Sequence, residues 1–329
     1  MKHKDEFKTS HDPLHDLYHE GLVDNPSHQK HLKNHATALL TIDLQFLDAA
    51  EGYGIFKDVH SAGMPESYQR YYFNTIHDYV LNNVQRLQAA FRDRDLEVMH
   101  TRIQALTQDG RDRSKGHRRL KILAKPGSKE AEFLPEIAPE GDEIVINKTA
   151  SGVFSSTNFN YVLTNMEMKA LYMCGVYTNE CVETTVRDAC DLGYLVTLVE
   201  DACTTVTREL HDASLATLRD RYARVITTDE AIAEIESSVE RLPRPVQMDA
   251  AQGWCLEDIE RGGAVVARET LGTMSLPESR CGRDTVSVSC RKGRLRLCGR
   301  HWDNVSLPGS CFGRNTVLGF FALERFYVG

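Results

Sequence analysis

Three side chains that together could carry out a nucleophilic reaction lie far apart in the sequence, each after an apolar segment. Asp43 follows residues 36–42, Lys148 follows residues 143–147, and Cys181 comes shortly after residues 169–174. A cysteine nucleophile needs a base to take its proton, and a carboxylate can serve if burial raises its pKa. An ammonium beside both groups stabilises developing negative charge. These residue types therefore predict a Cys–Asp–Lys site, provided that the fold brings them together.

The segment around Cys181 predicts that its thiol lies where a strand turns into a helix. Residues 169–174 form a short apolar run, and the residues after the thiol recur at helical spacing: Val182, Val186, Ala189 and Cys190. The unpaired N–H groups and the dipole at a helix start favour an anion, so we expect a lowered pKa for this thiol. The alternative interpretation is a buried structural cysteine, which is how free cysteines are most often used.

The elements that must position these residues alternate between strand and helix. Short apolar strands are predicted at 36–42, 96–100, 143–147, 169–174, 194–199 and 223–226, and helices at 74–94, after Cys181, at 211–222 and at 229–238. This alternation predicts an α/β fold with a doubly wound, mostly parallel sheet and helices on both faces. Ligands of such sheets bind at the carboxyl ends of the strands, where all three reactive residues fall.

Composition narrows the classes of function. The 329 residues carry a net charge of −8, which argues against nucleic acid as a partner. No stretch approaches the ~18 consecutive apolar residues of a membrane span. No apolar run follows Met1, so we expect a cytoplasmic protein. Its nine cysteines are then expected to be reduced thiols rather than a disulfide framework.

The two ends of the chain differ from its middle, residues 36–240. Residues 1–35 are predicted to form a solvated polar arm, and their seven histidines match no metal-ligand spacing: His3, His11, His15, His19, His28, His31 and His35. Residues 241–329 form an extension rich in arginine and cysteine, which we expect to be poorly ordered. Two alternatives there are a nucleic-acid or acidic-partner module and a zinc site, although the zinc candidates lack the usual Cys-x-x-Cys pairs: Cys281, Cys290, Cys298 and His301.

The middle of the chain resembles the isochorismatase-like cysteine hydrolases. The matching segments are Leu-Thr-Ile-Asp-Leu-Gln at 40–45, Ile-Asn-Lys at 146–148, the cysteine-centred segment 175–189, and the segments at 193–194 and 200–203. The resemblance covers about residues 33–240. It implies a six-stranded parallel sheet and a catalytic triad of Asp43, Lys148 and Cys181.

The resemblance also implies a role for each of these residues. Cys181 attacks the carbonyl carbon, Asp43 takes the thiol proton and delivers it to the leaving nitrogen, and Lys148 holds and polarises both. A cis peptide between Val176 and Tyr177 is expected. The N–H groups of Tyr177 and Cys181 then form an oxyanion hole.

The substrate class follows less directly. The zinc-ligand spacing of the nicotinamidase branch is missing after His100, so we predict no metal and no cofactor. A catalytic cysteine favours cleavage of an amide or ureide C–N bond, and residues 102–113 look most like ureidoacrylate-type or biuret-type amidohydrolases. The alternatives are an isochorismatase-type vinyl-ether hydrolase and a non-catalytic binding protein. By resemblance, the chain forms a dimer or tetramer.

Four residues are candidates for binding the substrate. Arg102 could grip a substrate carboxylate, or belong to a solvated basic loop. Gln45 could hydrogen-bond in the pocket or serve a structural role. Phe46 and Tyr177 are the other two. Family members often carry phenylalanine at the position of Asp48, which leaves the preference of the pocket wall open.

Overall fold

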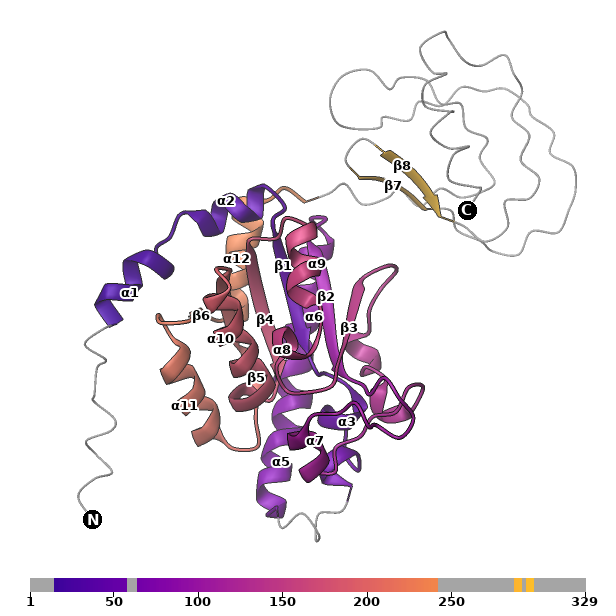
Figure 1. Cartoon of the computed structure of the whole chain (residues 1–329). Helices are drawn as coiled ribbons and strands as arrows, with labels where there is room; N and C mark the ends of the chain where they lie inside the picture. Colours follow the sequence, from indigo (N-terminus) through magenta and orange to yellow (C-terminus); the bar gives the residue numbers. More distant parts are fainter. Residues whose placement is uncertain (1–14, 58–63, 242–286, 292–293, 299–329) are drawn as a thin grey trace, which may run out of the picture. The chain divides into compact units, whose positions relative to one another are not determined.

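A single parallel sheet organises the fold (Figure 1). The computed structural model describes residues 15–57, 64–241, 287–291 and 294–298. Within these residues, six strands pair in the order β3-β2-β1-β4-β5-β6, and every pairing is parallel. The strands are β1 (Thr37–Ile42), β2 (Glu97–Ile103), β3 (Ile144–Lys148), β4 (Ala170–Val176), β5 (Leu195–Thr204) and β6 (Arg224–Ile226).

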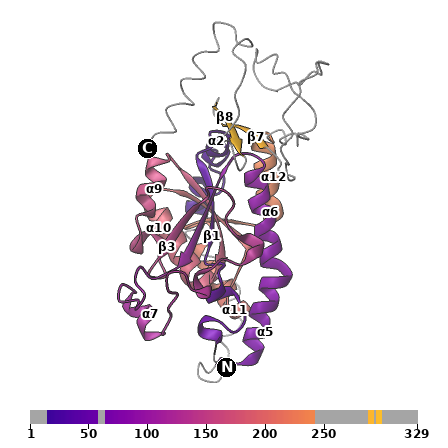
Figure 2. The ribbon, with the colours of Figure 1, turned by 90° about the vertical axis from the view of Figure 1, so that its right-hand side faces the viewer.

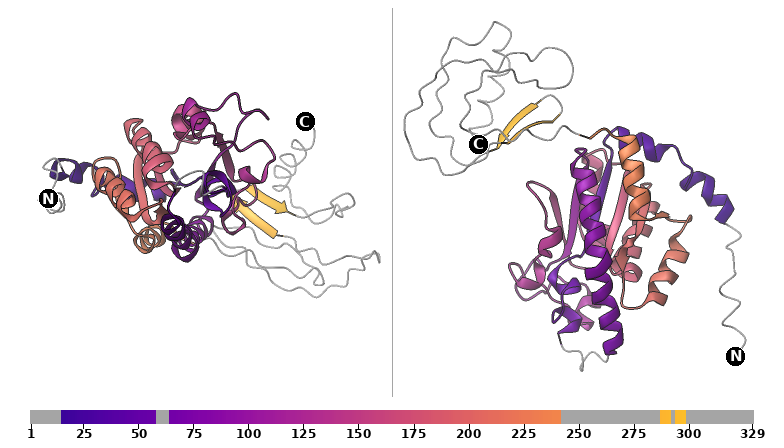
Figure 3. Two further views of the ribbon diagram at one scale, coloured as in Figure 1. Left: turned by 90° about the horizontal axis from the view of Figure 1, so that it is seen from below. Right: turned by 180° about the vertical axis from the view of Figure 1, so that it is seen from behind.

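Helices cover both faces of this sheet, which confirms the predicted doubly wound α/β class (Figure 2). One face carries the continuous run α5 (Glu66–Thr75), η2 (Ile76–Val80) and α6 (Leu81–Arg92), together with α12 (Thr228–Ser238). Figure 3 shows α6 and α12 side by side in front of the strands. The other face carries α9 (Phe159–Asn165) and α10 (Glu183–Asp191), with α11 (Arg208–Leu218) beside α10. Every residue of β1 and β4 is buried, as expected for central strands covered on both sides.

Shorter helices complete the described part of the chain. They are α1 (His15–Leu22), α2 (Ser27–Lys33), α3 (Phe46–Ala49), η1 (Gly54–Phe56), α7 (Lys115–Arg119), η3 (Lys129–Ala131), η4 (Pro135–Ile137), α8 (Val153–Ser156) and η5 (Thr178–Val182). In the described residues, no helix is both long and apolar enough to cross a membrane. The chain divides into two units, Met1–Leu242 and Pro243–Gly329.

The sheet reverses its winding direction between β1 and β4, and the backbones of these strands approach closely there. Gly175 in β4 has a φ of 123°, and a Cβ at this position would lie 2.1 Å from the Ile42 carbonyl oxygen. Glycine is therefore required at this position by both conformation and space. The peptide between Val176 and Tyr177, one residue further on, is cis, as the resemblance implied.

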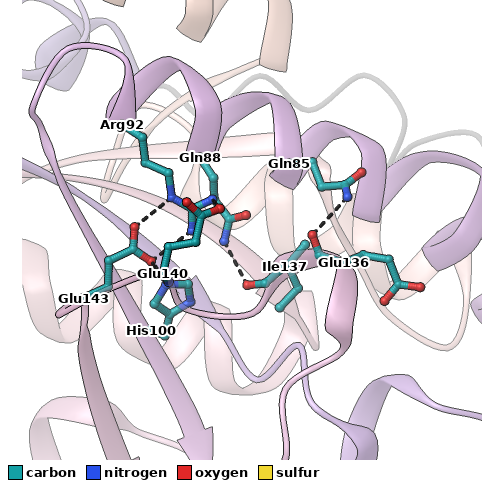
Figure 4. A network of polar contacts seen from close by, with 8 residues as sticks. All are labelled: Gln85, Gln88, Arg92, His100, Glu136, Ile137, Glu140 and Glu143. Atoms are coloured by element: carbon teal, nitrogen blue, oxygen red, sulfur yellow. Dashed lines mark hydrogen bonds and ion pairs between the residues drawn. The ribbon is translucent and has the colours of Figure 1, made fainter. Parts of the chain in front are cut away.

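A polar network fastens α6 to the β2–β3 edge of the sheet (Figure 4). Arg92 donates from Nε to Glu143 Oε1 at 2.7 Å and from Nη2 to Oε2 at 2.9 Å. His100 of β2 is fully buried, and its Nε2 lies 2.9 Å from Glu143 Oε2 while its Nδ1 lies 2.8 Å from Thr41 Oγ1. The network therefore links β1, β2 and the start of β3 to one helix.

Two expectations about the elements differ from the structure. The helix predicted at 74–94 begins earlier, at Glu66, and contains a π-helical turn at Ile76–Val80. The predicted solvated arm also contains α2, which packs against α12 and buries Leu32 completely. The prediction of a solvated arm is therefore wrong for α2. Its side chains Leu32 and His28 form a face that is buried.

The predicted C-terminal extension falls largely outside the described residues. Within it, the antiparallel pair β7 (Ser287–Arg291) and β8 (Arg294–Cys298) is described. Two of the candidate zinc ligands, Cys281 and His301, lie outside the described residues.

Candidate active site

Asp43, Lys148 and Cys181 meet at the carboxyl edge of the sheet. Lys148 Nζ lies 2.7 Å from Asp43 Oδ2 and donates to Cys181 Sγ at 3.2 Å and to the Ala150 carbonyl oxygen at 3.0 Å. The Asp43 carboxylate and the Cys181 thiol also interact electrostatically, and each shifts the pKa of the other. Exposed fractions are 0% for Lys148, 1% for Asp43 and 3% for Cys181. The buried ammonium therefore donates two hydrogen bonds and forms an ion pair with the Asp43 carboxylate.

The end of β1 and the neighbouring strand hold the Asp43 side chain in place. Asp43 has a φ of 54°, in the left-handed region that Asp and Asn adopt more readily than most residues. Its N–H donates to the Thr101 carbonyl oxygen at 3.1 Å, and Thr101 Oγ1 donates to Asp43 Oδ1 at 3.3 Å. Lys148 ends β3, on the other side of β2, and its long side chain spans that strand to reach Asp43.

Burial and pairing together set the charge state of the site. Burial raises the pKa of Asp43 above its ordinary value, although the Lys148 ammonium works in the opposite direction. Burial alone lowers the pKa of Lys148, but the charges of Asp43 and Cys181 overcome this and raise it. An ammonium paired with one carboxylate leaves the buried site neutral.

The expected lowering of the Cys181 pKa is wrong. Burial raises the pKa of this thiol well above its ordinary value, and the attraction of Lys148 only partly opposes burial and the repulsion from Asp43. The physical reason is that a thiolate would add a second negative charge to a buried site that holds one positive charge. The resting side chain of Cys181 is therefore a thiol rather than a thiolate.

The backbone around the nucleophile offers N–H donors. Tyr177 precedes the π-helical turn η5, which contains Cys181 and leads directly into α10. Within the described residues, the Tyr177 N–H donates to no backbone carbonyl. The oxyanion hole of Tyr177 and Cys181 N–H groups stays a prediction, with one donor free of a backbone partner.

Two of the predicted substrate-binding residues have structural partners. Gln45 is fully buried, its Nε2 donates to the carbonyl oxygens of Ile103 and Glu130, and its Oε1 accepts from the Ile103 N–H. Arg102 is half-buried and donates from Nε to Asn147 Oδ1 at 2.7 Å and from Nη1 to the Ala131 carbonyl oxygen at 2.9 Å.

The two aromatic candidates differ in their surroundings. Phe46 is half-buried, with the Lys129 ammonium 3.9 Å from its ring centroid. Tyr177 is buried, stacks on Tyr72 with ring centroids 5.2 Å apart, and donates from its hydroxyl to the Asp48 carbonyl oxygen at 3.2 Å.

Asp48 occupies the pocket-wall position that the family resemblance singled out, where no specific role was predicted for an aspartate. It lies in α3 and is 5% exposed, and its Oδ2 has no hydrogen-bond partner among the described residues. Burial and then the charge of Asp43 raise the pKa of Asp48 well above its ordinary value. Its spacing of five residues from Asp43 was the available signal, but the sequence did not show that α3 would bury it.

In the described ranges, no group of three or more His, Cys, Asp and Glu side chains is arranged to hold a metal ion.

Comparisons with known proteins place these observations in context. An isochorismatase domain model matches residues 37–230, more than half of the chain. The chain is 32% identical over 106 residues to the isochorismatase family protein YwoC of Bacillus subtilis, a match covering 32% of this chain and 56% of that protein. It is 32% identical over 113 residues to the ureidoacrylate amidohydrolase RutB of Acinetobacter baylyi, covering 34% and 46% respectively. The chain thus spans about half the length of these curated relatives.

A solved structure shares the fold. A cysteine hydrolase from Pseudomonas syringae pv. phaseolicola aligns with a TM-score of 0.50 at 24% sequence identity, covering 62% of this chain and 94% of that chain.

Proposed function

The chain belongs to the isochorismatase family of hydrolases, and we propose that it is a cysteine amidohydrolase that cleaves the C–N bond of a small amide or ureide and releases ammonia. The observation that carries this proposal is the buried cluster in which one ammonium, Lys148, contacts both the carboxylate of Asp43 and the thiol of Cys181. A nucleophile, a base and a fixed positive charge are what acyl transfer through a thioester requires.

In the first half of the reaction, the Cys181 proton passes to Asp43 as the sulfur attacks the substrate carbonyl carbon. The oxyanion that forms accepts hydrogen bonds from the Tyr177 and Cys181 N–H groups. Lys148 keeps the site neutral, because its positive charge balances whichever of Asp43 and Cys181 carries the negative charge. When the C–N bond breaks, protonated Asp43 gives its proton to the departing nitrogen, which leaves as ammonia.

The second half hydrolyses the thioester. Asp43, ionised again, takes a proton from water as the water oxygen attacks the thioester carbonyl carbon. The C–S bond then breaks, and the proton on Asp43 returns to the Cys181 sulfur. The enzyme regains its starting protonation state, and the carboxylic or carbamic acid product leaves.

The relatives support the choice of reaction class. RutB is named for ureidoacrylate amidohydrolase activity, and its partial match to this chain favours C–N cleavage. The raised pKa of Asp43 supports its role as a base, since a base works best when its pKa lies closer to the working pH.

The proposal is tested by measuring ammonia released from biuret, ureidoacrylate, N-carbamoyl amino acids, nicotinamide and simple amides. Wild type, Cys181→Ala and Cys181→Ser are compared, each with and without a chelator. We expect ammonia from at least one substrate, a loss of roughly 10⁴-fold or more in both variants, and no effect of the chelator. Absence of ammonia from every substrate, or activity retained by Cys181→Ala, would contradict the proposal.

A further inference from the structure

Beside the three reacting groups lies a buried carboxyl group with an unused acceptor. Asp48 is 5% exposed, and its Oδ2 has no hydrogen-bond partner among the described residues. Its backbone is held in place, because the hydroxyls of Tyr72 and Tyr177 donate to its carbonyl oxygen at 2.8 and 3.2 Å. A buried polar atom without a partner is rare in folded proteins and calls for an explanation.

The carboxyl of Asp48 lies within electrostatic reach of the nucleophile and its ammonium. Burial is the main cause of the raised pKa of Cys181, and the carboxylates of Asp43 and Asp48 add to it. Asp48 also contributes to the raised pKa of Lys148. The charges that act on Asp48 in turn are those of Asp43, Lys148 and Glu180. The Cys181 thiol therefore lies in the field of two carboxyl groups, those of Asp43 and Asp48.

The cationic side chains that could bind a substrate carboxylate here already have partners. Lys148 contacts Asp43, Cys181 and the Ala150 carbonyl oxygen. Arg102, the residue expected to grip a carboxylate, donates to Asn147 and to the Ala131 carbonyl oxygen. The one cation that contacts Cys181 among the described residues, Lys148, is thus already paired with Asp43, and an anionic substrate would have to share that charge.

We propose that Asp48 determines specificity: its carboxyl accepts a hydrogen bond from an N–H group of a neutral primary amide or ureide whose carbonyl Cys181 attacks. This inference rests on the proposed function and narrows its substrate class. A carboxyl group keeps an acceptor oxygen whether it is ionised or protonated. Substrates that carry a carboxylate, such as N-carbamoyl amino acids, are disfavoured because they bring a further negative charge toward the carboxyl groups.

A pair of thiol reagents tests this preference without knowledge of the substrate. Iodoacetamide carries a neutral primary amide, whereas iodoacetate carries a carboxylate of similar size. The rates at which each alkylates Cys181 in the full-length protein are measured by mass spectrometry and divided by their rates with glutathione. The ratio of the two normalised rates cancels the thiolate fraction, so a change in thiol pKa does not affect it.

For wild type we expect a ratio that favours iodoacetamide by about tenfold or more, because its N–H group can donate to Asp48 whereas the carboxylate of iodoacetate has no proton to donate. Asp48→Leu removes the acceptor while keeping a branched side chain with the same number of heavy atoms, and it should lower the ratio about tenfold. Asp48→Asn keeps an acceptor oxygen and should retain the ratio within about threefold.

Glu180→Gln is the matched control. It removes a carboxylate that also acts on Asp48 but is exposed and next to Cys181 in sequence, so the ratio should change by less than about twofold. Thermal unfolding of each variant checks the fold, and Asp48→Ala replaces Asp48→Leu, with the same expectation, if the latter does not fold. A wild-type ratio near one, a ratio unchanged in Asp48→Leu, or a Cys181 that neither reagent alkylates would overturn the inference.

Hydrolysis separates this inference from the proposed function. Ammonia released from biuret and from N-carbamoylglycine is compared for wild type and Asp48→Leu. If wild type releases ammonia but the reagent ratio does not depend on Asp48, the proposed function is supported and the role of Asp48 is refuted. An Asp48-dependent ratio without ammonia from any substrate refutes the hydrolase but supports an amide-binding pocket.

Discussion

At the scale of single residues, the site depends on a balance between two negative groups and one positive group. Lys148 can neutralise either Asp43 or Cys181 but not both, and burial makes an unbalanced charge costly. Each group therefore controls the protonation of the others. The site is best tested by removing one of the three ionisable groups and measuring how the protonation of the other two changes.

Removing the base should make the thiol more acidic while stopping the reaction. Asp43 repels the thiolate, so in Asp43→Asn the attraction of Lys148 is unopposed by that charge and the pKa of Cys181 should fall. Hydrolysis should fall about 10²–10⁴-fold, because the base is absent. Asparagine also tolerates the left-handed backbone at this position. The pH dependence of iodoacetamide alkylation at Cys181 should move to lower pH; an unchanged or upward shift would refute the assigned charge balance.

Removing the ammonium should destabilise the fold in a way that a second substitution repairs. Lys148→Met leaves the Asp43 carboxylate buried and unpaired, which should cost about 3–5 kcal/mol in the free energy of unfolding. Adding Asp43→Asn removes that stranded charge, so the double variant should be more stable than Lys148→Met alone. Urea unfolding of wild type, both single variants and the double variant measures this coupling, and additive losses would show that the pair does not interact.

At the scale of elements, the approach of β1 to β4 requires a residue without a side chain. In Gly175→Ala, a Cβ would lie 2.1 Å from the Ile42 carbonyl oxygen, at a φ of 123°. Gly193→Ala is the matched control, since its φ of 91° is also positive but nothing lies within 4 Å of its added Cβ. Both should lose roughly 1–3 kcal/mol from backbone strain.

The clash adds a further loss to Gly175→Ala alone, because its neighbouring atoms belong to the backbone and cannot rotate away. We expect the difference between the two variants to be about 2 kcal/mol or more by urea unfolding. Equal losses of unfolding free energy in the two variants would mean that β1 and β4 can move apart at little cost. Hydrolysis should also fall in Gly175→Ala, as Asp43 follows Ile42 directly.

The network between α6 and the β2–β3 edge should contribute stability that acid removes. Burial tends to raise the pKa of Glu143, but hydrogen bonds from His100 and Arg92 lower it from 4.5 to about 2. A carboxyl whose folded pKa is depressed stabilises the fold above its unfolded pKa and loses this effect as pH falls through the folded one. The contribution should therefore be complete above about pH 4.5 and decline toward pH 2.

The variant Glu143→Gln isolates this contribution. Its deficit in unfolding free energy relative to wild type should be larger at pH 5 than at pH 3, measured by urea unfolding. Glu140→Gln is the control, since Glu140 contacts the same Arg92 but is 70% exposed. The control should show little difference between the two pH values, and a deficit in Glu143→Gln that is independent of pH would exclude the assigned ionisation.

At the scale of the whole molecule, the sequence predicts strand ends better than side-chain partners. The apolar runs before Asp43 and Lys148 and the helical spacing after Cys181 were sufficient to place these residues at one edge, because a parallel sheet aligns its strand ends. The partners of Arg102 and the burial of Asp48 depend on contacts between distant segments, which periodicity does not encode. The predicted direction of the Cys181 pKa shift was wrong for the same reason. The position at a helix start predicts a lowered pKa, whereas burial by distant segments raises it.

Contacts between distant segments also indicate where the folded unit ends. The family model stops at residue 230, inside α12 (Thr228–Ser238). Beyond that point, Ile235 is fully buried, and the buried Arg94 of the segment after α6 donates to the Val239 carbonyl oxygen at 3.1 Å. These contacts extend the folded unit past residue 230, where the family model ends.

Two truncations of matched design test this boundary. A fragment of residues 1–241 keeps every one of these contacts and every contact described for Asp43, Lys148 and Cys181, so its ammonia release should equal that of the full chain within about twofold. A fragment of residues 1–230 loses Ile235 from the core and leaves the Arg94 guanidinium without the Val239 acceptor. Losing about 3 kcal/mol in this way should lower its unfolding temperature by roughly 6–12 °C. Equal unfolding temperatures for the two fragments would show that the end of α12 lies outside the cooperative unit.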